Sequence, residues 1–436
     1  MKLEEILKCT NGKILNAKRK KITGISTDTR KIKKGEVFIA LKGENFDGHN
    51  FVEEAFKKGA SYAIVEREIK GLNEIIVNDT LYALGEIAKN YRSKKDIRMI
   101  VITGTVGKTT TKEFIYNILK MKFNTAKNEK NYNNLIGVPM ELLKIKDEKF
   151  GVFEIGTSSP GEIRRLSQIT LPDVGIITEI TPVHLEFFKN IKNIFIEKSS
   201  MIEYVKDKII INGDNVYLKE IDSSKVIKVG FDKENDFVIN IIRANDNVIF
   251  KINNEEFEIK NKGRGMVLSA SFAIVTSILE NIDTETIRKG LDEELDVEHR
   301  MKIIRIGNLN VIDDTYNASP ASVKNAIEFL STKKHRIAVL GDMLELGEKS
   351  KHYHYLIGEF LKDKIDVLIC IGENSVYYKK GFGKGYYVKD IEEALKIIIE
   401  NAKEDSWILV KGSRKLKLED LIEKMRGKIC YTISTS

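Results

Sequence analysis

Short apolar stretches rich in β-branched residues alternate along most of the chain with segments whose apolar residues recur at helical spacing. This alternation is typical of β-α-β units built around a largely parallel sheet, so the pattern predicts an α/β fold. The stretches expected to form strands are 36–41, 62–65, 99–103, 151–155, 174–178, 208–211, 311–312, 337–340, 367–371 and 407–410.

Two interruptions in this pattern indicate domain boundaries. A predicted helix with Leu81, Leu84, Ala88 and Tyr91 on one face ends in the charged tract 92–96, directly before an apolar strand. A second boundary is expected near residue 300. Because 436 residues correspond to about three domains of average size, we expect a small α/β domain over 1–95, a central domain over 96–300 and a doubly wound, Rossmann-like domain over 301–436.

Composition and charge exclude several classes of protein. The chain is 42% hydrophobic and 31% charged, which favours a globular protein over a disordered one. The net charge of +8 comes from lysines scattered along the whole chain rather than from a basic block, so we expect no nucleic-acid partner.

The N-terminal residues and the cysteines indicate the cellular compartment of the protein. Glu4 and Glu5 stand where a signal peptide has cations, and no apolar run approaches the ~18 residues of a membrane span. The three cysteines are odd in number and lack metal-ligand spacing, which favours a reducing compartment. We therefore expect a cytoplasmic protein without a membrane span; these cysteines are Cys9, Cys370 and Cys430.

The segment 103–111 has the context of a phosphate-binding loop, between an apolar strand and a helical run. Glycines let backbone amides turn toward phosphate oxygens, Lys108 supplies a positive charge, and the Thr109 hydroxyl is a candidate ligand for Mg²⁺. The glycine spacing is shorter than in the common GxxxxGK[ST] form, so this is a variant loop. Its candidate nucleotide-binding residues are Gly104, Thr105, Val106, Gly107, Lys108, Thr109 and Thr110. The central domain is therefore expected to be P-loop ATPase-like, with a parallel or mixed sheet.

Two further polar residues follow neighbouring apolar strands. Glu154 and His184 are expected at the carboxyl-end edge of the sheet, where open α/β sheets bind their ligands. A carboxylate there needs a cation or an ion pair. Both residues are candidate metal ligands, and each also has a purely structural reading, as a salt-bridged strand end and as a satisfied structural histidine.

Taken in order, several motifs resemble those of the ATP-dependent Mur ligase family, and the similarity spans nearly the whole chain. They comprise Ser26–Arg30 with Asp47-Gly48-His49, the loop ending in 107–113, Asn131–Pro139, the trio of Glu154, His184 and Lys198, and the segments 313–320, 341–347 and 411–414.

The resemblance assigns roles to particular residues. It implies that Thr29, Asp47, Gly48 and His49 receive a UDP-sugar and that Asn131 and Asn134 lie near the reacting carboxylate. It implies ATP and Mg²⁺ as cofactors, with Arg300 and Asp314 joining the loop in holding the nucleotide. The implied metal site comprises Thr109, Glu154, His184 and Lys198, the last as a carbamate. The implied catalytic residues are Lys108, Glu154, His184 and Lys198.

The last motifs are most similar to those of family members that add D-alanyl-D-alanine to a UDP-N-acetylmuramoyl-tripeptide. The Asp-Asn-Pro-Arg motif of the ligases that add the third peptide residue is missing. The resemblance thus implies that ATP phosphorylates the terminal carboxylate of the tripeptide and that the dipeptide amine attacks the acyl phosphate, as part of peptidoglycan precursor synthesis. We expect a monomer.

Three positions depart from the family pattern. The family has His-Asn and a second Asn at the start of the last helix of the ATP domain, around the adenine, whereas this chain has Gly265, Met266 and Ser269. We therefore expect appreciable use of GTP or other triphosphates. Glu179 and Ser319 each replace an Asn, and we expect Glu179 to add a carboxylate near the metal site.

Other functions remain open at this stage. A folylpolyglutamate synthase shares the short loop and the lysine but lacks a separate domain like residues 1–95. Another Mur-type ligase would share most of the motifs. A P-loop motor would show ATPase activity stimulated by nucleic acid, and a regulatory nucleotide-binding module would leave Glu154 and His184 without a role.

Overall fold

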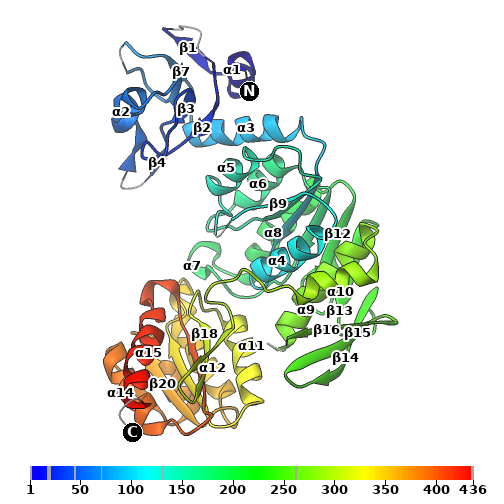
Figure 1. The fold of residues 1–436 in the computed structure, drawn as a ribbon, viewed down its shortest axis with the longest axis vertical. Helices are drawn as coiled ribbons and strands as arrows, with labels where there is room; N and C mark the ends of the chain where they lie inside the picture. Colours follow the sequence, from blue (N-terminus) through cyan, green and yellow to red (C-terminus); the bar gives the residue numbers. More distant parts are fainter. Residues whose placement is uncertain are drawn as a thin grey trace.

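Three sheets follow one another along the longest axis of the molecule, each with its own helices (Figure 1). The computed structural model describes residues 2–16, 21–43, 46–69, 71–129, 131–260 and 263–433, with side chains described up to residue 428, so the Cys430 side chain lies outside this description. The architecture is mixed α/β, as the alternation of apolar stretches and helical segments predicts.

The first sheet has the strand order β1-β7-β6-β3-β2 and is parallel except for β1. Val37, Ile39 and Ile64 pack on one face against α3, and Phe38, Ala40 and Ala63 pack on the other against α2. The elements are α1 (Leu3–Thr10), β1 (Lys13–Leu15), β2 (Gly24–Ser26), β3 (Glu36–Ile39), β4 (Lys42–Gly43), β5 (Phe46–Asp47), η1 (Gly48–Phe51), α2 (Val52–Lys57), β6 (Tyr62–Val65), β7 (Glu74–Ile76) and α3 (Thr80–Arg92).

The second sheet carries β8 (Arg98–Thr103) in its interior, paired in parallel with β10 (Phe150–Glu154) and β11 (Val174–Ile177). Both faces of β8 are covered by helices, which explains its uninterrupted apolar sequence. The other elements of this layer are α4 (Lys108–Leu119), β9 (Thr125–Lys127), α5 (Gly137–Leu142), α6 (Glu162–Thr170), α7 (Leu185–Phe188), α8 (Ile191–Ser199), η2 (Ser200–Tyr204), β12 (Lys208–Asn212), η3 (Leu218–Glu220) and β13 (Val226–Gly230).

An extension lengthens this sheet beyond the strands expected from the sequence. β14 (Phe237–Ala244) continues the parallel order, and β15 (Asn247–Ile252) and β16 (Glu255–Lys260) follow it antiparallel. Alternate residues of β15 and β16, including Val248, Phe250 and Phe257, are buried with α9 (Arg264–Leu279) and α10 (Thr284–Asp292). The strand order is β16-β15-β14-β13-β12-β11-β8-β10-β9.

The third sheet has the order β17-β18-β22-β19-β20-β21, parallel except for β17. Helices α11 to α13 cover one face and α14 and α15 the other, so the sheet is doubly wound. Its elements are β17 (Lys302–Ile306), β18 (Leu309–Asp314), α11 (Pro320–Ser331), β19 (Arg336–Gly341), η4 (Gly347–Lys349), α12 (Ser350–Phe360), β20 (Val367–Ile371), α13 (Val376–Phe382), β21 (Tyr386–Val388), α14 (Ile391–Asn401), β22 (Trp407–Lys411), η5 (Arg414–Leu416) and α15 (Glu419–Ile433).

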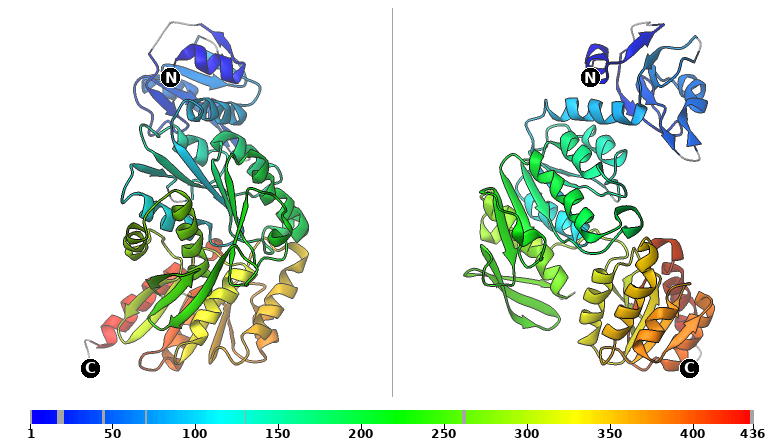
Figure 2. Two further views of the ribbon diagram at one scale, coloured as in Figure 1. Left: turned by 90° about the vertical axis from the view of Figure 1, so that its right-hand side faces the viewer. Right: turned by 180° about the vertical axis from the view of Figure 1, so that it is seen from behind.

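The connections between the sheets are short. Residues 93–97 join α3 to β8, and residues 293–301 join α10 to β17 (Figure 2). We therefore propose domain boundaries in these two connections, near 95 and 300. Within the described ranges, none of the helices has the length and apolar composition needed to cross a membrane.

Candidate active site

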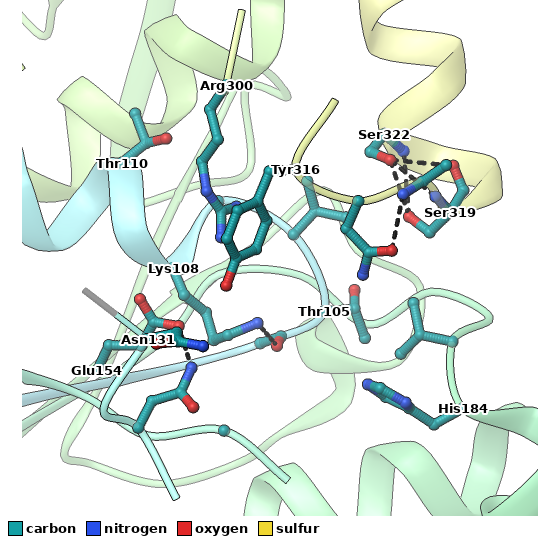
Figure 3. A pocket seen from close by; sticks show the side chains of 18 of the residues that line it. Thr105, Lys108, Thr110, Asn131, Glu154, His184, Arg300, Tyr316, Ser319 and Ser322 are labelled. Atoms are coloured by element: carbon teal, nitrogen blue, oxygen red, sulfur yellow. Dashed lines mark hydrogen bonds between the residues drawn. The ribbon is translucent and has the colours of Figure 1, made fainter. Parts of the chain in front are cut away.

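A cavity of about 500 Å³ lies where the carboxyl ends of the central strands face the third domain. Residues from both domains line it, and they include most of the candidates singled out from the sequence (Figure 3). The candidates on its wall are Gly104, Thr105, Val106, Gly107, Lys108, Thr110, Asn131, Asn134, Glu154, His184, Lys198, Arg300 and Asp314.

The loop between β8 and α4 forms one wall of the cavity. Gly104 has φ +142° and Gly107 has φ +88°, values that favour glycine. A Cβ atom on Gly104 would lie 2.0 Å from the Thr178 hydroxyl, which itself donates a 2.6 Å hydrogen bond to the Val106 carbonyl. No side chain caps α4 at Gly107, so the first amides of this helix remain available for an anion.

Lys108 is the first residue of α4, and its ammonium donates a 2.9 Å hydrogen bond to the Gly104 carbonyl. Desolvation lowers its pKa, and the nearby charge of Arg300 lowers it further, while Glu154 opposes both effects. Figure 3 shows Lys108, Glu154 and Arg300 gathered on one side of the cavity. This gathering suits a ligand that carries several negative charges.

Glu154 ends β10 and is almost fully buried. One carboxylate oxygen accepts a 2.6 Å hydrogen bond from the Thr109 hydroxyl, and the other accepts one of 2.7 Å from the Asn133 amide. Burial alone would raise the pKa of Glu154, but Lys108 and Arg300 outweigh it and hold the pKa below its usual value. The carboxylate is therefore ionised.

Asn128 fixes the backbone at the same point. Its amide donates to the Glu154 carbonyl at 2.9 Å and its oxygen accepts from the Glu154 N–H at 2.8 Å. Sequence reasoning singled out Asn131 and Asn134, whereas the residues bonded to Glu154 are Asn128 and Asn133. Asn131 does line the cavity, and Asn134 caps the backbone of the following turn through Ile136 and Gly137.

Lys198 lies on α8 with 3% of its surface exposed. Burial lowers its pKa to about 7, and the neighbouring charge of Lys108 contributes to this shift. A large fraction of Lys198 is thus neutral at physiological pH, the form in which an amine reacts with CO₂. Apart from the family resemblance, the local sequence is that of an ordinary solvated helix, so the burial of Lys198 is a finding of the structure.

His184 stands apart from this cluster. Its Nδ1 lies 2.5 Å from a carboxylate oxygen of Glu345 in the third domain, and Figure 3 shows its ring well separated from Glu154. The Glu345 carbonyl also accepts a hydrogen bond from the Glu186 N–H at 3.2 Å. In this arrangement His184 links the central and third domains.

Glu179 does not lie in the cavity that contains the proposed metal ligand Glu154, although the sequence suggested a position near the metal site. Its carboxylate accepts hydrogen bonds from the amides of Asn212 and Asn215, and burial raises its pKa. It lines a neighbouring cavity of about 210 Å³ rather than the one that contains Glu154. In the described part of the chain, no hydrogen bond or ion pair joins Glu179 to Glu154.

The residues present fit a magnesium ion in part. Among the residues that the structure describes, no three His, Cys, Asp or Glu side chains lie close enough together to hold a metal. However, the ionised Glu154 and the Thr109 hydroxyl offer adjacent hard oxygen ligands, the kind that Mg²⁺ prefers. A carbamate on Lys198 would add an anionic oxygen.

Arg300, at the end of the central domain, and residues of the third domain supply the opposite wall. The Arg300 guanidinium lies 4.0 Å from the centre of the Tyr316 ring, and Asp314 accepts a 2.6 Å hydrogen bond from Lys411. Burial raises the pKa of Asp314, while Lys411 opposes the shift. Tyr316 and Lys411 belong to motifs quoted from the sequence but were not singled out as site residues.

The candidates in the first domain do not reach this cavity. His49 is buried, with Nδ1 2.6 Å from Asp47 and Nε2 accepting from the Glu66 N–H at 2.9 Å. Gly48 packs closely on Leu41, since a Cβ atom there would lie 2.6 Å from the Leu41 carbonyl. Thr29 accepts a bond from Lys58 through its carbonyl. These contacts fix the positions of Thr29, Asp47, Gly48 and His49 within the first domain.

Comparison with known proteins decides the family. The sequence profiles that match are "Mur ligase family, catalytic domain" over residues 21–92, "Mur ligase middle domain" over 102–276 and "Mur ligase, glutamate ligase domain" over 299–414. The chain belongs to the Mur ligase family. One relative of this Mur ligase is UDP-N-acetylmuramoyl-tripeptide--D-alanyl-D-alanine ligase of Bacillus subtilis (strain 168), 33% identical over 425 residues that cover 93% of each chain.

Solved structures of Mur ligases agree. The chain matches MurF from Acinetobacter baumannii with a TM-score of 0.93 and 29% identity, covering 98% of this chain and 99% of that one. It matches MurF ligase from Thermotoga maritima in complex with ADP with a TM-score of 0.86 and 27% identity, covering 94% and 98%. The three-domain architecture is therefore that of known Mur ligases.

Proposed function

We propose that this Mur ligase is an ATP-dependent amide ligase that joins D-alanyl-D-alanine to UDP-N-acetylmuramoyl-tripeptide in peptidoglycan precursor synthesis. The observation that carries the proposal is the shared cavity, in which the phosphate loop, Glu154 and Arg300 come together. The named function of the B. subtilis relative, matched over 93% of both chains, selects the substrates.

The side chains of the cavity suit phosphoryl transfer to a carboxylate. This reaction needs positioning and charge neutralisation rather than a protein nucleophile. Lys108 and Arg300 neutralise the phosphates, and the free amides of α4 hold them. Asn131, which lies beside Glu154 in Figure 3, orients the peptide carboxylate. The product of this step is an acyl phosphate on the tripeptide, which the dipeptide amine attacks to form the amide and release phosphate.

We further propose that Thr109, Glu154 and a carbamylated Lys198 hold Mg²⁺. When bound, the ion would supply positive charge that offsets the negative charge of the phosphates. The chain prepares this site by keeping Glu154 ionised and Lys198 partly neutral. For His184 we propose a positioning role in closing the third domain over the cavity, because it pairs with Glu345. Closure excludes water, which would hydrolyse the acyl phosphate.

The first domain is the proposed receptor for the UDP-sugar, with Thr29, Asp47, Gly48 and His49 forming or supporting its binding site. Asp47 and His49 are fixed by their mutual contact and by Glu66, so this site is preformed. We also propose that the enzyme acts as a cytoplasmic monomer. The free thiols of Cys9 and Cys370 support the proposed compartment, since disulfides are rare in the cytoplasm.

Phosphate release tests the proposed reaction. Purified protein should release phosphate from ATP only when both UDP-N-acetylmuramoyl-tripeptide and D-alanyl-D-alanine are present, and mass spectrometry should detect the UDP-linked pentapeptide. Release that needs neither substrate, or that nucleic acid stimulates, would overturn the proposal in favour of a P-loop ATPase. Activity with a folate and glutamate would favour the folylpolyglutamate-type alternative.

A further inference from the structure

The part of the cavity between α9 and α11 differs in chemistry from the part around Glu154. Small and apolar residues line it, among them Gly265 and Met266 from α9 and Ala318 and Ala326 from the third domain. The two helices contact each other and lie side by side (Figure 1). A pocket lined by small residues beside a phosphate loop suits the planar base of a nucleotide.

The polar side chains of this pocket differ in what they leave free to read a base. The Ser269 hydroxyl and the Asn317 amino group have no hydrogen-bond partner among the described residues, but neither side chain pairs a free amide oxygen with a free amino group. Ser319 and Ser322 bond to each other as the capping box of α11, as the dashed lines in Figure 3 show. The Asn317 oxygen accepts from the Ala318 N–H. For Asn325, by contrast, neither end of the side-chain amide has a hydrogen-bond partner among the described residues, and Asn325 lines both this cavity and the smaller one next to it.

Asn325 occupies the space that a side chain at residue 265 would need. A Cβ atom built on Gly265 would lie 3.0 Å from the Asn325 amide nitrogen. The backbone of Gly265 is not in the left-handed region, so no strain requires glycine at this point of α9. The absence of a side chain at Gly265 on α9 therefore leaves room in the pocket for the side-chain amide of Asn325 on α11.

We propose that Asn325 is the residue that recognises the adenine of ATP, an inference that rests on the proposed function of the cavity as the ATP site. An Asn side chain offers a carbonyl acceptor and an amino donor side by side. Adenine presents the complementary pair, its N6 amino group and N7, whereas guanine presents acceptors at both corresponding positions. Base selectivity thus comes from the third domain, although the sequence of α9 alone suggested that it would be lost.

Nucleotide binding measured by isothermal titration calorimetry tests this assignment directly. Asn325→Ala should weaken ATP binding about tenfold and leave GTP binding unchanged, since the lost hydrogen bonds are specific to adenine. Alanine is a good helix former, so α11 should persist, and the melting temperature checks this. Lys324→Ala is the matched control, because the Lys324 ammonium lies 5.3 Å from the centre of the Phe360 ring. It should leave the preference for ATP over GTP unchanged.

A double variant separates base recognition from a general loss of stability. Gly265→Asn alone should weaken ATP binding, because its side chain meets the Asn325 amide. Combined with Asn325→Ala, the same substitution should bind ATP more tightly than Asn325→Ala alone, since an amide again enters the pocket. An unchanged ratio of ATP to GTP affinity in Asn325→Ala, or equal affinities in the wild type, would overturn the assignment.

These outcomes are distinguishable from failure of the proposed function. A wild-type protein that binds ATP selectively but forms no amide from the two substrates would remove the proposed ligase reaction and leave Asn325 as the base-recognition residue. A ligase that forms the amide equally well with ATP and GTP would support the proposed reaction and would remove Asn325 as the base-recognition residue. A wild-type protein that binds no nucleotide would overturn both.

Discussion

The Thr109 hydroxyl donates a 2.6 Å hydrogen bond to Glu154, which joins the first turn of α4 to the end of β10. The two residues are far apart in sequence, yet together they place a hydroxyl and a carboxylate beside the phosphate loop. Because Asn133 holds the other carboxylate oxygen, the orientation of Glu154 is fixed before any ligand arrives.

Glu154→Gln should lower the rate of amide formation by about 100-fold or more, because the substitution removes the anionic oxygen proposed to hold Mg²⁺ while keeping the size of the side chain. The Mg²⁺ concentration needed for half-maximal activity should rise. Steady-state kinetics across a magnesium titration measures both effects. Glu203→Gln, an exposed partner of Arg164, is the control. A normal magnesium dependence in Glu154→Gln would contradict the assigned metal site.

Lys108→Ala should abolish amide formation, since it removes the charge that faces the phosphates, with a loss of at least about 100-fold in kcat. Binding of UDP-N-acetylmuramoyl-tripeptide, measured by calorimetry, should survive because the first domain is untouched. Lys120→Ala is the matched control, because Lys120 directly follows the same helix and its ammonium pairs with Glu293 at the surface. Near-normal turnover by folded Lys108→Ala protein would show that the phosphate loop is assigned wrongly.

Lys198→Ala should lose most of the activity, and acetate should restore part of it by supplying carboxylate oxygens in the vacated space. Lys198→Arg should stay inactive with or without acetate, because a guanidinium is not carbamylated and fills that space. Activity assays at increasing acetate concentration measure the rescue. Lys192→Ala, at an exposed position of α8, should behave as the wild type. Full activity of Lys198→Ala without acetate would remove this lysine from the mechanism.

The buried Lys198 should also make stability depend on pH. Its pKa is lowered to about 7, so the unfolded chain binds this proton more tightly than the folded protein does. Lys198 therefore lowers the free energy of unfolding by its full amount below pH 7, and this destabilisation decreases as the pH rises above 7. Lys198→Met should be more stable than the wild type at pH 6, and the difference should shrink toward pH 9. Denaturant unfolding in CO₂-free buffer measures it; a difference that is constant with pH would contradict the lowered pKa.

The sequence pattern predicted the interior strands well because their physical signal is strong. Residues 99–102 are a continuous apolar run, and residues 151–155 are apolar except for Glu154; the strands that contain them, β8 and β10, are buried along nearly their whole length. The strands β14 to β16 were missed because β14 is largely exposed and only alternate residues of β15 and β16 are buried. The alternation of apolar and polar residues over Asn247–Ile252 is a pattern from which this strand could have been predicted.

The site was less predictable where it depends on contacts between distant segments. Four asparagines lie between 128 and 134, and only the conformation of the loop decides that Asn128 and Asn133 bond to Glu154. The partner of His184 is Glu345, which no spacing rule connects to it. The pKa of Lys198 is lowered because the side chain is buried. The local sequence does not show that this lysine is buried.

The strand order of the third domain bears on how the protein is made. β22 is the last strand in the chain, yet it lies between β18 and β19 and carries Lys411, the partner of the buried Asp314. While a ribosome is still synthesising this chain, β18 and β19 have no common neighbour until residues 407–411 emerge. A polypeptide released prematurely before that point would leave both strands with open edges and Asp314 without its cation, so we expect it to be aggregation-prone rather than partly active.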